Sequence, residues 1–319
     1  MSNKPAGLSN DSLWPRAGGW PSPDDIAPGK RIDAALVGIP ASQTSLSATN
    51  AHETPDAIRA ALFRYSPALM QDRGVLDKNL RNDPAIIDLE ELTVADFGNV
   101  TDPDSPAGEA RTIALMADAA KASELVIALG GDNSITVAAA LGVWGSDLET
   151  AGLITLDAHY DLRDGVSNGS PVRRLIEAGM NPDRIVQIGI QDFANSASYA
   201  RRAHELGITV IHRDDLERRS MADVMAEALS IAGSAGGPIH VDLDVDVCDR
   251  AVAPACPASV PGGISAYELR QASRAAGKHP QVHSIDLAEI DATMDAPDGR
   301  TIRLAALCVL EAVAGLSQR

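Results

Sequence analysis

Short runs of aliphatic residues alternate with Ala-rich stretches from residue 34 to the C-terminus. Apolar runs of roughly four to eight residues are typical of buried strands, and longer stretches with apolar positions three and four apart are typical of helices. Several of the Ala-rich stretches open with Pro or directly follow Ser, as helix N-termini often do. The pattern predicts strands at 34–39, 86–89, 125–129, 152–156, 184–190, 208–211, 239–244 and 282–288, and helices that include 55–65, 106–122, 171–178, 222–232, 266–276 and 303–315.

Alternating strands and helices predict the α/β fold class, with a mainly parallel sheet of about eight strands between two layers of helices. Apolar residues make up 45% of the chain and aromatic residues only 3%. The core must therefore consist mostly of Ala, Leu, Ile and Val, which suits parallel strands covered by helices. No internal repeat or break in composition divides the chain. We expect one folded domain at 31–319, preceded by an irregular arm at 1–30 that Trp14 and Trp20 could pack in place.

The formal net charge of −17 restricts the partners of this protein. Nucleic acid and anionic membranes both attract basic surfaces, so we expect neither as a partner. No stretch approaches the ~20 apolar residues that span a membrane, and the N-terminus lacks the apolar core of a signal peptide. Cys248, Cys256 and Cys308 form no CxxC pattern, which favours packed apolar side chains in a reducing compartment. These features predict a cytoplasmic protein.

Polar residues that directly follow predicted strands form the candidate site, because ligands of parallel sheets sit outside the carboxyl ends of the strands. Asp157, His159 and Asp161 follow the strand at 152–156. Side chains alternate in extended backbone, so these three project to one side. Three such groups would repel one another and lose hydration unless a cation held them. This segment therefore predicts a metal site.

A second carboxylate cluster supports the same interpretation. Asp242, Asp244 and Asp246 stand at alternate positions in and after the strand predicted at 239–244. The two clusters together form an oxygen-rich set with one imidazole, which favours Mn²⁺, with Fe²⁺, Ni²⁺ or Zn²⁺ as alternatives. So many carboxylates exceed the needs of one divalent ion. We therefore expect two ions that share bridging carboxylates and lower the pKa of a bridging water.

A third segment at 130–134, Gly-Gly-Asp-Asn-Ser, follows the strand at 125–129. The paired glycines allow a tight turn, and Ser134 could cap the next helix. On its own, this segment has a structural explanation as good as a functional one.

Taken together, these segments resemble the ureohydrolase family, which comprises arginase, agmatinase, formimidoylglutamase and related guanidino-acid hydrolases. The family pattern GGDHS is similar to residues 130–134, DAHxD matches residues 157–161 in full, and SxDxD…AP…PGG resembles residues 242–263. The resemblance covers about residue 34 to the C-terminus. It implies an arginase-like catalytic domain over 31–319, hydrolysis of a C–N bond in an amidine or guanidine, and homo-oligomers, either trimers or hexamers.

The resemblance also selects a register for the 242–246 segment, where three aspartates compete for two ligand positions. Counting back from the AP and PGG motifs places the two ligands at Asp244 and Asp246, and the family's serine at Asp242. The distance onward to Glu289, which resembles the family's substrate-orienting glutamate, supports the same register.

By the same resemblance, Asp157 and one aspartate of that pair bridge two Mn²⁺ ions, while His159 binds one ion and Asp161 the other. Asp161 would also hold the bridging hydroxide through a hydrogen bond. The full implied ligand set is Asn133, Asp157, His159, Asp161, Asp244 and Asp246.

One ligand departs from the family pattern, because Asn133 stands where GGDHS has histidine. An amide oxygen can bind a metal, but it is a poorer donor than imidazole to Mn²⁺ or Ni²⁺. The departure should weaken the ion that Asp161 also holds. Three outcomes are open: Asn133 works as a ligand, the site runs on one tight and one weak or absent ion, or activity is lost.

Several short motifs resemble formimidoylglutamase more than the other family members. They lie at residues 161–163 with 167–171, at 189–195 and at 295–304, whereas the Pro-Gly-Gly sequence at 261–263 is closer to agmatinase. The implied reaction is hydrolysis of formimidoylglutamate, a linear amidine of histidine degradation, by a metal-activated hydroxide.

Three residues are expected to bind this substrate. Glu289 would bind its N–H groups through charge-assisted hydrogen bonds. Arg163 could pair with a substrate carboxylate, although a salt bridge to Asp164 or another acid is an equal alternative. Asn168 stands near the point where arginase and agmatinase usually carry a histidine, which argues against a long amine leaving group. His52 lies in a loop that faces the substrate in the family.

Two rival functions are kept alongside this one. An agmatinase or guanidino-acid hydrolase would release urea from a guanidine substrate. A non-catalytic, metal-poor family member would act as an assembly partner or ligand-binding protein, and Asn133 is the feature that supports it.

Overall fold

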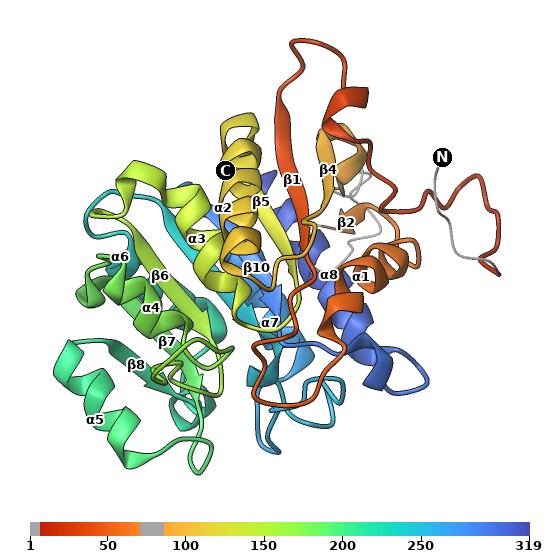
Figure 1. The fold of residues 1–319 in the computed structure, drawn as a ribbon. Helices are drawn as coiled ribbons and strands as arrows, with labels where there is room; N and C mark the ends of the chain where they lie inside the picture. Colours follow the sequence, from red (N-terminus) through yellow and green to blue (C-terminus); the bar gives the residue numbers. More distant parts are fainter. Residues whose placement is uncertain (1–6, 71–85) are drawn as a thin grey trace, which may run out of the picture.

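The computed structural model describes residues 7–70 and 86–319, and its main feature is an eight-stranded sheet in which every paired strand is parallel (Figure 1). Helices cover both faces of this sheet, which confirms the predicted three-layer α/β/α architecture. The strands are β1 (Ile32–Ile39), β4 (Val94–Asn99), β5 (Ser123–Gly130), β6 (Gly152–Leu156), β7 (Ile185–Ile190), β8 (Thr209–His212), β9 (Ile239–Asp244) and β10 (Val282–Ala288). They run side by side in the order β4-β1-β5-β10-β9-β6-β7-β8.

The helices divide between the two faces. One face carries α1, α6, α7 and α8, the other carries α2, α3 and α4, and α5 packs beside the edge strand β8. Local signals fix several helix starts: Ser105 accepts a hydrogen bond from Gly108 N at 3.0 Å, and Ser265 forms a capping box with Glu268. The helices are α1 (Thr54–Leu62), α2 (Pro106–Ala122), α3 (Ile135–Trp144), α4 (Pro171–Glu177), α5 (Ala197–Leu206), α6 (Met221–Ala232), α7 (Ala266–Lys278) and α8 (Arg300–Leu316).

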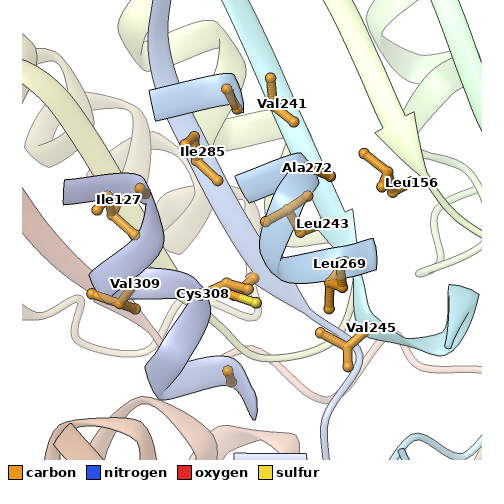
Figure 2. Close-up of a cluster of buried hydrophobic side chains, with 14 of the residues drawn as sticks. Ile127, Leu156, Val241, Leu243, Val245, Leu269, Ala272, Ile285, Cys308 and Val309 are labelled. Carbon is orange, nitrogen blue, oxygen red and sulfur yellow. The ribbon is translucent and has the colours of Figure 1, made fainter. Parts of the chain in front are cut away.

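The two faces of β9 differ in chemistry. Val241 and Leu243 point into the apolar core under α7, where Leu269 lies nearby (Figure 2). Because side chains alternate along a strand, Asp242 and Asp244 point to the opposite face. Every residue of β9 is buried, so these carboxylates enter the protein interior rather than the solvent. The three cysteines are unpaired and buried, as the sequence predicts.

The edge of the sheet differs from the prediction. The run at 86–89 does not join the main sheet, because β3 (Ile86–Asp88) pairs antiparallel with β2 (Ala68–Met70). The edge strand is β4, which the hydrophobic pattern missed because polar residues and a glycine interrupt its apolar positions. Asp96 of β4 stays partly exposed and accepts two hydrogen bonds from Arg59, at 2.7 and 2.8 Å. A half-buried edge strand of this kind leaves no continuous apolar run for sequence analysis to find.

The residues before β1 contain no helix or strand apart from a 3₁₀ turn at Pro23–Asp25, within the described part of the chain. Trp20 packs against the core, whereas Trp14 is half exposed and has the Arg16 guanidinium 5.9 Å above its ring. Of the predicted arm, residues 1–6 lie outside the described residues. None of the described helices has the length and apolar character needed to cross a membrane.

The last strand of the chain lies in the middle of the sheet. β10 separates the group β4-β1-β5 from the group β9-β6-β7-β8 and pairs with β5 on one side and β9 on the other. Because the strands are parallel, the carboxyl ends of β5, β10, β9 and β6 lie next to one another along one edge of the sheet. All the predicted metal ligands lie in the segments that follow these strands, except Asp244, which is the last residue of β9.

Candidate metal centre

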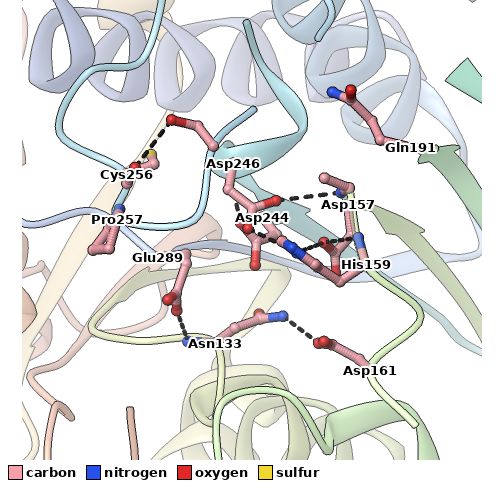
Figure 3. A network of polar contacts seen from close by, with 12 residues as sticks. Asn133, Asp157, His159, Asp161, Gln191, Asp244, Asp246, Cys256, Pro257 and Glu289 are labelled. Carbon is pink, nitrogen blue, oxygen red and sulfur yellow. Dashed lines mark hydrogen bonds and ion pairs between the residues drawn. The ribbon is translucent and has the colours of Figure 1, made fainter. Parts of the chain in front are cut away.

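Four neighbouring strand ends contribute the candidate site (Figure 3). Asn133 follows β5, the 157–161 segment follows β6, Asp244 ends β9, and Glu289 follows β10. A cavity of about 340 Å³ opens beside them, and Asp161, Asp244 and Glu289 are among the residues that line it. The position agrees with the expectation that ligands sit at the carboxyl ends of parallel strands.

Asp157, His159 and Asp246 converge most closely. A potential ligand atom of each lies within 4.8 Å of those of the other two, and no other three His, Cys, Asp or Glu residues of the described chain do so. His159 Nδ1 lies 3.0 Å from Asp246 Oδ2 and 3.3 Å from Asp157 Oδ1. Asp246 Oδ1 also accepts a hydrogen bond from Ala158 N at 3.2 Å. Two segments far apart in the sequence thus present one imidazole and two carboxylates to the same point.

The other predicted ligands form a second group beside this one. Asn133 donates through Nδ2 to Asp161 Oδ2 at 2.7 Å and through its backbone N–H to Glu289 Oε2 at 2.8 Å (Figure 3). Asp244 Oδ1 accepts a hydrogen bond from Asp246 N at 2.9 Å, which connects it to the first group. All six residues implied as ligands therefore lie in two adjoining groups at one edge of the sheet.

The three aspartates of the 242–246 segment differ in their position relative to the cavity. Asp244 and Asp246 line the cavity, whereas Asp242 does not and is completely buried. Both carboxylate oxygens of Asp242 lack a hydrogen-bond partner among the described residues. Its neighbour across the sheet is Asp286 of β10. Asp242 therefore lies one layer deeper than the residues that reach the cavity.

The glycine pair after β5 serves close packing rather than a left-handed turn. Neither Gly130 nor Gly131 has a positive φ. A Cβ atom on Gly131 would lie only 2.5 Å from the carbonyl oxygen of Ala41, so no larger residue fits there. The predicted cap at Ser134 is wrong: its backbone is already helical and its hydroxyl donates to Asp132 instead of accepting from the helix. The turn therefore brings β5 against the neighbouring loop and sets the position of Asn133.

Two site residues adopt a left-handed backbone that residues with side chains rarely use. Asp161 has φ 53° and Glu289 has φ 66°. Such conformations cost about 1–3 kcal/mol each and persist where the surrounding contacts outweigh the strain. Glu289 N donates to Gly131 O at 2.9 Å, and Asp161 O accepts from Arg173 N at 3.3 Å. These backbone contacts hold both carboxylates at the cavity.

The buried carboxylates of the site outnumber its positive charge, and most of their pKa values are raised. Burial, together with the charge of Asp246, raises the pKa of Asp157 to about 6. Burial and neighbouring carboxylates raise the pKa of Asp161 and of Asp244 well above the usual range. Burial, with the charges of Asp132 and Asp246, raises the pKa of Glu289 to about 8. A bound cation would reverse each of these effects, because it favours the ionised carboxylate.

His159 is the exception, because it is the cation of the site in this state. Burial favours the neutral imidazole, but the charges and hydrogen bonds of Asp246 and Asp157 outweigh it and raise the pKa of His159 to about 12. The same contact outweighs burial for Asp246, whose pKa is lowered. A metal ion needs a neutral imidazole as a ligand, so binding an ion here must release the His159 proton.

The residues present fit a divalent metal centre. Asp157 Oδ2 is buried and has no hydrogen-bond partner within the described chain, so a strong acceptor faces the site unused. Carboxylates with one imidazole are the donor set that suits Mn²⁺. Asn133 fits less well as it stands, because Thr136 Oγ donates to its Oδ1 at 2.9 Å and its Nδ2 faces Asp161. Turning the amide over would present the oxygen to the site, and the Thr136 hydroxyl can accept as well as donate.

The structure brings all three predicted substrate-binding residues, Arg163, Asn168 and Glu289, to the same cavity. Asp164 pairs with Arg202 at 2.8 Å, so the alternative in which Asp164 binds Arg163 is wrong. The Arg163 side chain is exposed, and its guanidinium makes no hydrogen bond or ion pair within the described part of the chain. Asn168 Nδ2 donates to Glu289 Oε1 at 2.6 Å. Arg163 is therefore free to bind an anion, while Asn168 holds the Glu289 carboxylate in place.

His52 is not among the residues that line this cavity. Its ring is exposed, and Nδ1 lies 3.4 Å from Ser42 Oγ. His240, in contrast, is fully buried and hydrogen-bonds Ser284 and Asp286, as a structural histidine does.

Sequence reasoning assigned no role to Asn195, which lines the cavity and hydrogen-bonds the backbone of the ligand segment 157–161. Its place in the 189–195 motif was the only available signal. The partners of this amide are backbone groups, which every residue type carries, so no pairing of residue types in the sequence indicates the contact.

Comparison with known proteins gives a consistent result. The model of the arginase family matches residues 32–315. Formimidoylglutamase of Halalkalibacterium halodurans is 34% identical over 297 residues, covering 90% of this chain and 88% of that protein. The crystal structure of formimidoylglutamase from Bacillus subtilis superposes with a TM-score of 0.81 at 26% identity, covering 98% of this chain and 95% of the other. A Trypanosoma cruzi formiminoglutamase structure with Mn²⁺ shares the fold, with a TM-score of 0.77 at 22% identity and coverage of 90% and 94%.

Proposed function

This chain belongs to the arginase family of metallohydrolases, and from that premise we propose that it hydrolyses formimidoylglutamate. The observation that carries the proposal is the free guanidinium of Arg163 in the same cavity as Glu289 and the candidate ligands His159 and Asp246. The carboxylates that line the cavity suit a cationic amidine, while Arg163 suits a carboxylate. A substrate with an amidine at one end and carboxylates at the other matches both.

The ligand set that we propose comprises the two adjoining groups. Asp157, His159 and Asp246 would hold one side, and Asp161 with Asn133 the other, with Asp244 between them. Two Mn²⁺ ions there would supply a hydroxide nucleophile at neutral pH by lowering the pKa of bound water. The fit of one oxygen-rich, largely buried set supports manganese, and Ni²⁺, Fe²⁺ or Zn²⁺ are alternatives to be measured.

Two carboxylates of the chain act on the reacting groups. Asp161, held by the strained backbone at φ 53°, would accept a hydrogen bond from the attacking nucleophile and orient it. Glu289 would accept hydrogen bonds from the amidinium N–H groups and hold its carbon in line for attack. Asn168 and the backbone of Asn133 each donate to one Glu289 oxygen, and each oxygen keeps a further lone pair that can accept from the substrate. As the tetrahedral intermediate collapses, a C=O bond forms, one C–N bond breaks, and the departing nitrogen takes up the proton of the added hydroxyl group.

Arg163 determines the substrate class in this proposal. Its guanidinium would bind a glutamate carboxylate in bidentate fashion. A substrate with a neutral or cationic alkyl chain offers no such acceptor. Tyr199 and Asn195 line the same cavity. Agmatine, which carries no carboxylate, should therefore be a poor substrate.

The decisive experiment combines metal content with product analysis. Protein purified with Mn²⁺ is analysed for metal per subunit and then incubated with formimidoylglutamate, while formamide, glutamate and ammonia are quantified together. Near two ions per subunit with turnover supports the proposal and shows that Asn133 works as a ligand. An Asp157→Ala variant serves as the control, because it removes the buried carboxylate and should lose both metal and activity.

The rival functions give different results in the same experiment. Urea released from agmatine or a guanidino acid, with no turnover of formimidoylglutamate, would overturn the proposal in favour of a guanidine hydrolase. Substoichiometric metal with no turnover of any amidine would support the non-catalytic alternative. The mass of the native protein in solution tests the predicted trimer or hexamer.

A further inference from the structure

The segment that carries three of the proposed ligands has no regular secondary structure. Residues 157–161 continue from β6, but none of them belongs to a strand or helix. Asp157, His159 and Asp161 alternate with Ala158 and Tyr160, whose side chains are buried. The ligand side chains can converge only if the backbone at Ala158 and Tyr160 is held still, because each ligand sits next to one of them.

Asn195 supplies that support from the loop between β7 and α5. Its Oδ1 accepts a hydrogen bond from Tyr160 N at 3.1 Å, and its Nδ2 donates to Ala158 O at 2.8 Å. A further contact runs from Nδ2 to Gln191 O at 3.2 Å, within its own loop. One amide thus joins both intervening residues of the ligand segment, and all its hydrogen bonds go to backbone.

Neighbouring contacts complete this support without replacing it. Gln187 of β7 donates to Tyr160 O at 2.9 Å, and Gln191 N donates to Ala158 O at 3.1 Å. Among the described residues, Asn195 is the one whose side chain bonds the backbone at both positions. Without it, Tyr160 N would lose its hydrogen-bond acceptor, and Ala158 O would keep only the bond from Gln191 N.

We propose that Asn195 is a positioning residue of the metal centre: it holds the backbone of residues 157–161 so that Asp157, His159 and Asp161 converge on the ions. The inference rests on the proposed metal site, but not on the identity of the substrate. Preorganised ligands bind a metal more tightly, because less conformational freedom is lost on binding. Outer contacts that orient ligands typically contribute about 10–100-fold in metal affinity.

The role can be separated from general stability. Asn195 lies in a surface loop beside Asp192 and Phe193, both exposed, so a smaller side chain there leaves no buried cavity. The first turn of α5 is capped by Ser196, whose hydroxyl accepts from Tyr199 N at 3.3 Å, and not by Asn195. Loss of the Asn195 amide should therefore leave α5 and the sheet intact.

Asn195→Ala is compared with wild type and with Asn181→Ala. Asn181 is a matched control, because its side chain also accepts a backbone N–H, that of Asp183 at 3.0 Å, at a turn that does not line the cavity. Mn²⁺ affinity is measured by titration, with free Mn²⁺ followed by electron paramagnetic resonance. Melting temperatures are taken in chelator, and the Mn²⁺ concentration for half-maximal activity is compared with KM for formimidoylglutamate.

The expected result is a loss of about 10–100-fold in Mn²⁺ affinity for Asn195→Ala, with a matching rise in the half-activating Mn²⁺ concentration. The melting temperature in chelator should match that of Asn181→Ala, and KM should change less than the metal affinity. Asn195→Ser keeps a short polar side chain, so it should give an intermediate loss and serves as the test if the alanine variant does not fold.

Unchanged Mn²⁺ affinity in both Asn195 variants would overturn the inference. A rise in KM with unchanged Mn²⁺ affinity would also overturn it, because it would assign Asn195 to direct substrate contact. If wild type binds Mn²⁺ but does not turn over formimidoylglutamate, the substrate assignment fails, while a weaker affinity in the variants would still support the positioning role. If wild type binds no Mn²⁺, both proposals fall.

Discussion

Asn168 donates from Nδ2 to Glu289 Oε1 at 2.6 Å, joining the loop after β6 to the end of β10. The same amide accepts a hydrogen bond from Leu46 N at 3.0 Å, so a third segment of the chain is attached to it. The other Glu289 oxygen accepts from Asn133 N at 2.8 Å. Burial raises the pKa of Glu289 to about 8, and these two donors limit the rise by stabilising the carboxylate. These two hydrogen bonds therefore fix the orientation of the Glu289 carboxylate and favour its ionised form before any substrate binds.

Removing the Asn168 amide should impair catalysis without affecting the metal. Asn168→Ala deletes one of two donors to Glu289, and a hydrogen bond to a charged group contributes about 1.5–3 kcal/mol. We expect kcat/KM for formimidoylglutamate to fall by about 10–100-fold, while Mn²⁺ content stays at the wild-type level. Steady-state kinetics and metal analysis of the same preparation check both parts. Equal kcat/KM in Asn168→Ala and wild type would show that Glu289 needs no such support.

Substituting Arg163 should affect the binding of carboxylate substrates selectively. Arg163→Ala removes the free guanidinium of the cavity, and we expect KM for formimidoylglutamate to rise about 10–100-fold, because a charge-assisted hydrogen bond is lost. Arg163→Lys should recover only part of the lost affinity, because the ammonium keeps the positive charge but cannot make the bidentate contact. Hydrolysis of formamidine, which lacks a carboxylate, is the internal control and should be equal in all three proteins. A similar loss of kcat/KM for both substrates would show that Arg163 supports the structure of the site and does not recognise the substrate carboxylate.

Replacing Asn133 with the family's histidine should tighten the weaker ion. Asn133→His exchanges an amide oxygen for an imidazole, a better donor to Mn²⁺, on the side of the site that Asp161 shares. We expect more Mn²⁺ per subunit after dialysis and a smaller dissociation constant for the second ion. Isothermal titration measures both, with Asn181→His as a control for an added surface histidine. Unchanged metal content per subunit would refute this prediction.

The metal-free protein should become less stable as the pH rises from about 4 to about 8. In the folded chain, burial raises the pKa of Asp157 from 3.8 to about 6 and that of Glu289 from 4.5 to about 8. Over this range the folded state binds more protons than the unfolded state, so the free energy of unfolding falls with rising pH. His159, whose pKa is raised to about 12 chiefly by Asp246 and Asp157 against the effect of burial, acts in the same direction above pH 6.5.

Thermal unfolding in chelator, followed near pH 5 and near pH 8, checks this pH dependence. A pKa difference of one between the two states corresponds to about 1.4 kcal/mol, so the decrease should be readily measurable. Added Mn²⁺ should raise the melting temperature more near pH 8 than near pH 5, because protons compete with the metal for the same ligands. A metal-free protein that melts higher near pH 8 would contradict the prediction.

Sequence patterns located the ligand segment but not its backbone. Asp157, His159 and Asp161 follow β6 as expected, but this segment is not an extended strand. Asp157 and His159 converge with Asp246, whereas Asp161 contacts Asn133 (Figure 3). The pattern failed at β4, where half-exposed positions interrupt the apolar run. It also gave no indication of the left-handed backbone at Asp161 and Glu289, which tertiary contacts impose.

The contacts that hold the site together were the least predictable part. Asn195 acts through the backbone of Ala158 and Tyr160, and a backbone partner has no residue type to match. The orientation of Asn133 depends on Thr136, one helical turn away, and on Asp161 from another strand end. Such details follow from three-dimensional arrangement and not from spacing along the chain.

The central place of β10 determines when the site can form during synthesis. A nascent chain that ends before Val282 contains two groups of strands but lacks the strand that joins them. Asp157, His159 and Asp246 all belong to the group around β6 and β9, so we expect that they can meet before β10 has been synthesised. Asn133 belongs to the other group and meets Asp161 only after β10 has entered between β5 and β9. Contacts between distant segments form late in folding, so we expect the second half of the metal centre to close only after β10 has been synthesised and has paired with β5 and β9.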